Sequence, residues 1–167
     1  MSDPLSAIIL GGVIILLIIA SAFFSSAETA LTAASEPRIR QLAKTGNKQA
    51  IRVEQLRHDR EKLISTILIG NNAVNVLASA IATSAAIALT GDSGVVLATL
   101  FMTVVLVLCA EVLPKSYAFN HADKFSLKIA LTVQILVFLL TPLSWAVRSI
   151  VVFMLGTPDS DTDKREE

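Results

Sequence analysis

The chain has 167 residues, of which 53% are hydrophobic, and its 14 basic and 14 acidic residues give a formal net charge of zero. This balance, without any stripe of alternating basic and aromatic residues, argues against binding to nucleic acid. A single cysteine, Cys109, excludes an internal disulfide. The apolar residues are gathered in a few long runs, which indicates an integral membrane protein of the all-α class.

The first of these runs begins almost at the N-terminus. Residues 4–27 carry no charge, and about 20 apolar residues of helix suffice to cross a bilayer. We therefore expect a first membrane span over about residues 5–27. Its N-terminal flank carries Asp3 instead of a basic cluster, and the run is longer than the apolar region of a signal peptide, so we expect it to be retained.

A polar stretch over residues 35–62 follows and is rich in positive charge. It holds eight lysines and arginines: Arg38, Arg40, Lys44, Lys48, Arg52, Arg57, Arg60 and Lys62. The positive-inside rule places this stretch in the cytoplasm and the N-terminus outside. Ser35-Glu36-Pro37 is typical of a helix start, and Thr45-Gly46-Asn47 interrupts the helical spacing. We expect two short amphipathic helices under the bilayer, over about residues 36–60; a solvated charged surface is the alternative.

Two further spans are expected over about residues 63–90 and 95–118, joined outside the membrane by a tight turn at residues 91–94. The next apolar run, over residues 129–147, is open to two interpretations. Hydropathy favours a fourth crossing. Pro142 removes a backbone donor and Arg148 follows it, which favours a helix lying along the membrane instead. We expect residues 1–155 to form the membrane domain and residues 156–167 a charged tail.

The spans contain a few polar side chains at regular spacing. Ser21 and Ser25 share one helix face, and so do Asn71 and Asn75. Glu111 is the one carboxylate well inside an apolar run. Polar groups within spans usually face the interior of the bundle, and by residue count these groups all fall in the inner half of the membrane.

Each of these groups has an alternative structural explanation. An asparagine in a span often only links helices, and a glutamate near a helix end often extends its carboxylate to the interface. Glu28 continues the face of Ser25 but lies closer to the boundary, where the interfacial explanation is favoured. Asn72 fits either face of its helix. Whether Glu28 or Asn72 contacts an ion therefore stays open.

Hydroxyl and amide oxygens with one carboxylate are suited to a hard cation, since no thiolate or imidazole cluster is present for zinc or copper. Magnesium takes six oxygens at about 2.0–2.1 Å. Gly70, with Pro114 opposite, indicates locally loosened helices whose carbonyls turn inward. One carboxylate leaves a bound divalent ion with a net positive charge, which suits reversible binding and transport. Calcium, manganese or sodium would fit the same atoms. The predicted metal ligands are Ser21, Ser25, Gly70, Asn71, Asn75 and Glu111.

Three motifs together resemble the transmembrane domain of the CorC/CNNM family of magnesium transporters. They are Ser-Ala-Phe-Phe-Ser-Ser-Ala-Glu-Thr-Ala over residues 21–30, Gly70-Asn71-(x3)-Asn75 and Glu111-Val112-Leu113-Pro114-Lys115. Each motif is weak alone, whereas their order and spacing are fairly specific, and the resemblance covers essentially the whole chain. The Ser21, Ser25, Asn71, Asn75 and Glu111 positions match the magnesium site of the family.

The resemblance implies a homodimer in the inner (plasma) membrane, with three transmembrane helices per protomer, an external N-terminus and a cytoplasmic C-terminus. Residues 122–155 would then form a juxtamembrane belt instead of a fourth crossing. It also implies magnesium export, with sodium influx as a candidate driving force. Family members continue into CBS nucleotide-binding domains, so we expect a chain truncated before them, and ATP-linked regulation is not assigned to it.

The sequence leaves the direction of transport, the coupling ion and the preference for magnesium over calcium or manganese open. A rival hypothesis is a sensing or scaffolding module that binds magnesium without moving it. No enzyme is expected, since the sequence has no HExxH or GxSxG motif and no pair of intramembrane aspartates.

Overall fold

The computed structural model describes the backbone of residues 4–91 and 93–155 and the side chains of residues 5–91 and 93–142. This part of the chain consists of helices joined by short turns and contains no strand, so the predicted all-α class is confirmed. The elements are α1 (Pro4–Ala33), α2 (Glu36–Lys44), α3 (Lys48–His58), α4 (Arg60–Thr90), α5 (Ser93–Val105), the π-helix η1 (Leu106–Val112), α6 (Leu113–Asn120) and α7 (Ala122–Leu155). The predicted tail, residues 156–167, lies outside the described residues.

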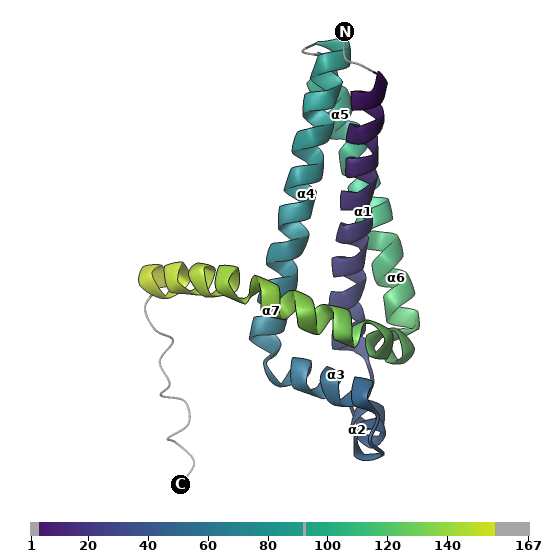
Figure 1. Ribbon diagram of the computed structural model, residues 1–167, viewed down its shortest axis with the longest axis vertical. Helices are drawn as coiled ribbons and strands as arrows, with labels where there is room; N and C mark the ends of the chain where they lie inside the picture. The colour runs from purple at the N-terminus through teal and green to yellow at the C-terminus, as the bar shows by residue number, and fades with distance from the viewer. Residues whose placement is uncertain (1–3, 92, 156–167) are drawn as a thin grey trace.

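Three rods run side by side along the long axis of the molecule (Figure 1). Two of them are α1 and α4, and the third is the continuous series of α5, η1 and α6. The start of α1, the end of α4 and the start of α5 lie at one end of the rods, and α2 and α3 lie at the other. These rods and the first part of α7, Ala122–Pro142, are the four helical segments in the described chain that are long and apolar enough to cross a membrane. The chain is therefore a multi-pass membrane protein.

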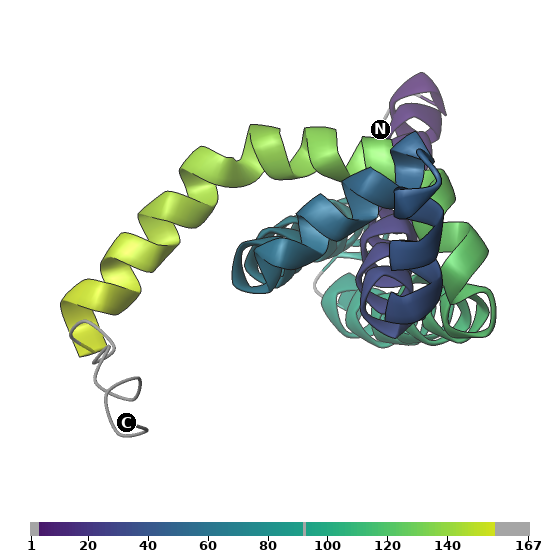
Figure 2. The same cartoon turned by 90° about the horizontal axis from the view of Figure 1, so that it is seen from below.

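Helix α7 takes a different direction from the three rods. It lies across α1 and α4 in Figure 1, and Figure 2 shows it curving away from the rest of the molecule. It contacts α1, α3 and α4. Pro142 lies inside it, and a proline within a helix removes one backbone hydrogen bond and bends the axis. Length and composition thus qualify α7 as a span, whereas its direction separates it from the other three.

The basic stretch folds into the two short helices that the sequence predicts. Helix α2 ends at Lys44, Gly46 takes a positive φ of 86°, and the side chain of Asn47 caps α3 by accepting from the backbone N–H groups of Gln49 and Ala50. The start of α2 differs from the expectation. The Ser35 side chain makes no capping hydrogen bond, and the Ser35 backbone N–H donates to the Asp123 carboxylate at the start of α7 instead (2.8 Å).

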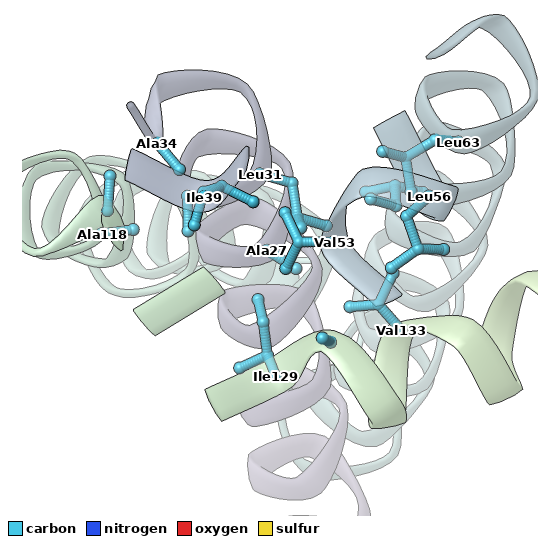
Figure 3. Close-up of a cluster of buried hydrophobic side chains, with 14 of the residues drawn as sticks. Ala27, Leu31, Ala34, Ile39, Val53, Leu56, Leu63, Ala118, Ile129 and Val133 are labelled. Atoms are coloured by element: carbon cyan, nitrogen blue, oxygen red, sulfur yellow. The ribbon is translucent and has the colours of Figure 1, made fainter. Parts of the chain in front are cut away.

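The buried apolar core lies at the α2–α3 end of the molecule. Figure 3 shows side chains from the end of α1, from α2, α3 and α7, and from the start of α4 converging there, and Leu31, Ile39, Val53 and Val133 are almost fully buried. The rods are different, because many large apolar side chains along them, such as Phe101, are exposed. A membrane span presents such side chains to lipid. Among the described residues, the main cluster of buried apolar side chains therefore lies at the end of the rods.

Asp123 joins this core to α7, and replacing it tests how much that junction contributes. Its carboxylate accepts from the Ser35 backbone and from Arg38 Nη1 at 3.0 Å, and hydrogen bonds to charged groups contribute about 1.5–3 kcal/mol. We expect Asp123→Ala to lower the free energy of unfolding in detergent by about 1–2 kcal/mol. The matched control is Glu36→Gln, which removes the exposed pair with Arg40 and should cost about 0.5 kcal/mol or less. Equal losses for the two variants would contradict the role given to Asp123.

Candidate functional site

The candidate site begins on one face of α1. Ser21 and Ser25 lie four residues apart and are 0% and 1% exposed, because this face turns toward α4 and η1, with which α1 is in contact. Both hydroxyls are thus buried within the helix bundle, as the sequence pattern predicts for polar residues in a span.

The Ser21 hydroxyl donates a hydrogen bond to Asn71 Oδ1 at 2.9 Å. This bond joins α1 to α4 between two residues 50 positions apart in the chain. The structure therefore brings together the polar groups of the first two predicted spans, which periodicity could place only on separate helix faces.

Two further oxygens of the predicted set are buried without a partner. Within the described residues, Ser25 Oγ and Asn75 Oδ1 have no hydrogen-bond partner. A buried polar atom left in this state costs about 1–3 kcal/mol. Both atoms lie one helical turn from the Ser21–Asn71 bond, Ser25 on α1 and Asn75 on α4. The two helices consequently supply a group of neutral oxygens with unused capacity to accept, which is the donor set that a hard cation uses.

Gly70 has a packing role. A Cβ atom on Gly70 would lie 2.7 Å from Phe24 Cζ and 3.3 Å from Leu140 Cδ1, so the missing side chain lets α1, α4 and α7 meet. The expectation of a loosened helix at Gly70 is wrong, because α4 is a continuous helix from Arg60 to Thr90. A side chain at this position would compete with the Phe24 ring for space, and this steric demand accounts for the glycine.

The departure from α-helical geometry lies in the third rod, α5–η1–α6, instead. Residues 106–112 form a π-helix, in which the backbone hydrogen bonds join residues five apart instead of four, and such segments are frequent at functional sites. Glu111 lies in this segment and Pro114 follows it in the first turn of α6. The sequence signalled the position through Pro114, but the π-helical geometry has no clear sequence signature.

The structure brings Glu111 onto a segment that packs against α1. The neighbouring Ala110 is completely buried, Glu111 is half-buried, and η1 contacts α1. Glu111 takes part in none of the ion pairs found within the described chain. The segments that carry the predicted site residues, α4 and η1, therefore both pack against α1, and a hydrogen bond joins Ser21 to Asn71.

Sequence reasoning missed a charge pair next to these residues. Lys115 Nζ lies 3.7 Å from Glu28 Oε2 and joins α6 to α1. The signal was present, since Glu28 follows Ser25 by three residues and Lys115 follows Glu111 by four. Asn72, whose role the sequence left open, is exposed on α4, on a different face from the half-buried Asn71 and Asn75.

Neither a cluster of titratable side chains nor the cavity between α2 and α3 adds to the candidate site within the described residues. They contain no group of three or more His, Cys, Asp or Glu side chains able to hold an ion. A cavity of about 590 Å³ between α2 and α3 is lined by Ile39, Gln55 and several charged residues, and none of the candidate oxygens borders it. A cation site in this part of the chain would therefore depend mainly on neutral oxygens.

Comparison with known proteins gives one family. Residues 12–167 match the model of the cyclin M transmembrane N-terminal domain, CNNM. The chain is 39% identical over 141 residues to the UPF0053 inner membrane protein YfjD of Escherichia coli, covering 84% of this chain and 33% of the relative. It is 40% identical over 144 residues to a UPF0053 protein of Haemophilus influenzae, covering 86% and 34%. A chloroplastic DUF21 domain-containing protein of Arabidopsis thaliana is 38% identical over 120 residues, covering 72% and 18%. The chain thus spans about a third of the length of the two bacterial relatives.

The orphaned hydroxyl of Ser25 gives a test of the site that needs no ligand. Because Ser25 Oγ is buried without a partner, Ser25→Ala should raise the free energy of unfolding of the cation-free protein by about 1 kcal/mol. Chemical denaturation in detergent with a chelator present measures this change. Ser26→Ala is the control, since the Ser26 hydroxyl donates to the Phe23 carbonyl and its loss should be neutral or destabilising. A loss of stability in both variants would show that the Ser25 hydroxyl is satisfied.

A substitution at Gly70 tests the close approach of α1 and α4. We expect Gly70→Ala to lower the free energy of unfolding by about 1–3 kcal/mol, because its methyl group would overlap the Phe24 ring. The loss should be smaller in a Phe24→Leu background, giving a coupling energy of at least about 0.5 kcal/mol in a double-mutant cycle. Gly12→Ala is the control, because a Cβ there would meet nothing within 4 Å. Additive effects at Gly70 and Phe24 would contradict the packing role.

Proposed function

The chain belongs to the CorC/CNNM family of membrane proteins, and from this premise we propose that it is the membrane domain that moves magnesium ions across the plasma membrane. One observation carries the proposal. The buried hydroxyl–amide pair of Ser21 and Asn71 is flanked by two buried oxygens, on Ser25 and Asn75, that have no hydrogen-bond partner. A multi-pass membrane protein gains nothing in stability from such atoms, so a role in binding a transported ion accounts for them.

The proposed ligands divide into neutral and charged groups. The side chains of Ser21, Ser25, Asn71 and Asn75 supply neutral oxygens, and Glu111 supplies the negative charge. The Gly70 carbonyl is a further proposed ligand. It would become available only if α4 opened locally, because α4 is a regular helix at Gly70. One carboxylate leaves the complex with a net positive charge, and the weak electrostatic hold permits release. Magnesium retains part of its water shell in such sites.

The proposed topology has three crossings. The rods α1, α4 and α5–η1–α6 would span the membrane with the N-terminus outside, since the positively charged α2 and α3 then lie in the cytoplasm. Helix α7 would form the juxtamembrane belt, and its direction across the rods supports this reading (Figure 1). We further propose a homodimer. The many exposed apolar side chains of α5, among them Val96, Leu100 and Phe101, leave surface for a second copy as well as for lipid.

Transport would proceed by alternating access to the ion, and export with sodium influx as the driving force is the direction we propose. The π-helix η1 is the segment best suited to change shape, because its widened turn can convert to an α-helical one without loss of the helix. Such a conversion would reorient Glu111 relative to α1. The ion would then exchange the carboxylate for water on one side of the membrane.

A second candidate function is a magnesium-sensing or scaffolding module that holds the ion without moving it. The same buried oxygens favour it, since binding alone would also satisfy Ser25 and Asn75. Flux across proteoliposomes distinguishes the two candidates, because a sensor binds magnesium and gives no flux.

Glu111 is the residue whose replacement tests the site. We expect Glu111→Gln to weaken magnesium binding at least about 100-fold in calorimetry, because removing the only charge at a divalent site costs several kcal/mol. Magnesium flux in proteoliposomes should fall to the background of empty vesicles. Asn72→Ala, on the exposed face of α4, is the control and should leave binding and flux unchanged. Unaltered affinity in Glu111→Gln would overturn the assignment of the site.

A further inference from the structure

We propose that Glu28 is a positioning residue that holds the Lys115 ammonium away from Glu111 and so keeps the Glu111 carboxylate free for a cation. The inference rests on the proposed function, since it concerns access to the same site. The sequence left open whether Glu28 contacts an ion. The proposal gives Glu28 a different role, because it binds Lys115 and not the metal.

Lys115 has two possible carboxylate partners. Glu111 precedes it by four residues on the same rod, and a glutamate four residues before a lysine is the favourable orientation for an ion pair along a helix. The π-helix ends at Val112, so the two residues remain about one turn apart. The four-residue spacing alone would therefore predict an ion pair between Lys115 and Glu111.

In the structure, Lys115 is paired with Glu28 instead. Lys115 Nζ lies 3.7 Å from Glu28 Oε2, across the contact between α6 and α1, whereas Glu111 takes part in none of the ion pairs within the described chain. Both side chains of the Glu28–Lys115 pair are partly exposed, at 34% and 46%. A partly exposed pair contributes little to stability. Its main effect is therefore on the position of the Lys115 ammonium.

The consequence for a cation follows from the electrostatics. An ammonium bound to Glu111 would neutralise the only carboxylate of the site, and a divalent ion would have to displace it. With Lys115 neutralised by Glu28, Glu111 keeps its full charge for the cation. Lys115 also lies about 6 Å along the rod from Glu111, given the rise of four helical residues, so an unpaired ammonium there would repel a bound ion as well.

The two members of the pair should therefore affect cation affinity in opposite directions. In Glu28→Gln the released Lys115 ammonium competes for Glu111, and we expect the calorimetric Kd for magnesium to rise about five- to tenfold. In Lys115→Met no competitor remains, and Kd should stay the same or fall by up to about fivefold. The double variant Glu28→Gln/Lys115→Met should return to within about twofold of the unsubstituted protein.

A purely structural ion pair predicts a different pattern. Both single variants would then lower the midpoint of thermal unfolding to the same extent and would change the Kd for magnesium in the same direction or leave it unchanged. Either of these results, or a double variant as weak as Glu28→Gln alone, would overturn the proposal. Glu36→Gln and Lys124→Met serve as charge controls away from the site, and both should leave the Kd unchanged.

The design separates this inference from the proposed function. If Glu111→Gln abolishes magnesium binding while the Glu28 and Lys115 variants fail to diverge, the site stands and the positioning role of Glu28 is overturned. If Glu111→Gln binds magnesium normally, the proposed site is overturned, and with it the need to keep Glu111 free.

Discussion

Helix α1 meets α4 where Gly70 has no side chain, and the ring of Phe24 fills the space that a Cβ atom would occupy. This approach brings the polar face of α1 against that of α4, so that the Ser21 hydroxyl reaches Asn71 at hydrogen-bond distance. It also buries Ser25 and the amide oxygen of Asn75 without partners. The close packing at Gly70 thus accompanies a concentration of buried oxygens on the facing sides of α1 and α4.

The charges around this region are arranged by contacts between helices that are distant in the sequence. Asp123 holds the start of α7 against α2 through the Ser35 backbone and Arg38, and Glu28 holds Lys115 against α1. Glu111 is left without such a partner in the described chain. Two carboxylates on neighbouring helices therefore have different surroundings, since Glu28 is paired with a lysine and Glu111 takes part in none of the ion pairs of the described chain. Separation of this kind is how one protein gives similar side chains different roles.

Breaks in helical regularity of the π-helical kind are frequent at functional sites of helical proteins. Gly70 and Pro114 both suggested such breaks, yet only the rod that contains Pro114 departs from α-helical geometry, as the π-helix η1. The reason is that a glycine is readily accommodated in a helix whose neighbours pack closely against it, whereas a proline removes a backbone donor and its ring displaces the preceding turn. The irregular segment is also the one that carries Glu111.

The sequence by itself determined the all-α class, the long apolar helices, the short pair α2 and α3 and the residue types of the candidate site, because these depend on local spacing and composition. It could not determine which partner each polar group would find. The bond between Ser21 and Asn71, the choice of Glu28 over Glu111 by Lys115, and the direction of α7 across the rods were decided by tertiary packing. Helical periodicity fixes the face on which a residue lies, but the distance between faces of separate helices depends on how closely the helices approach, and here Gly70 and Phe24 determine that approach.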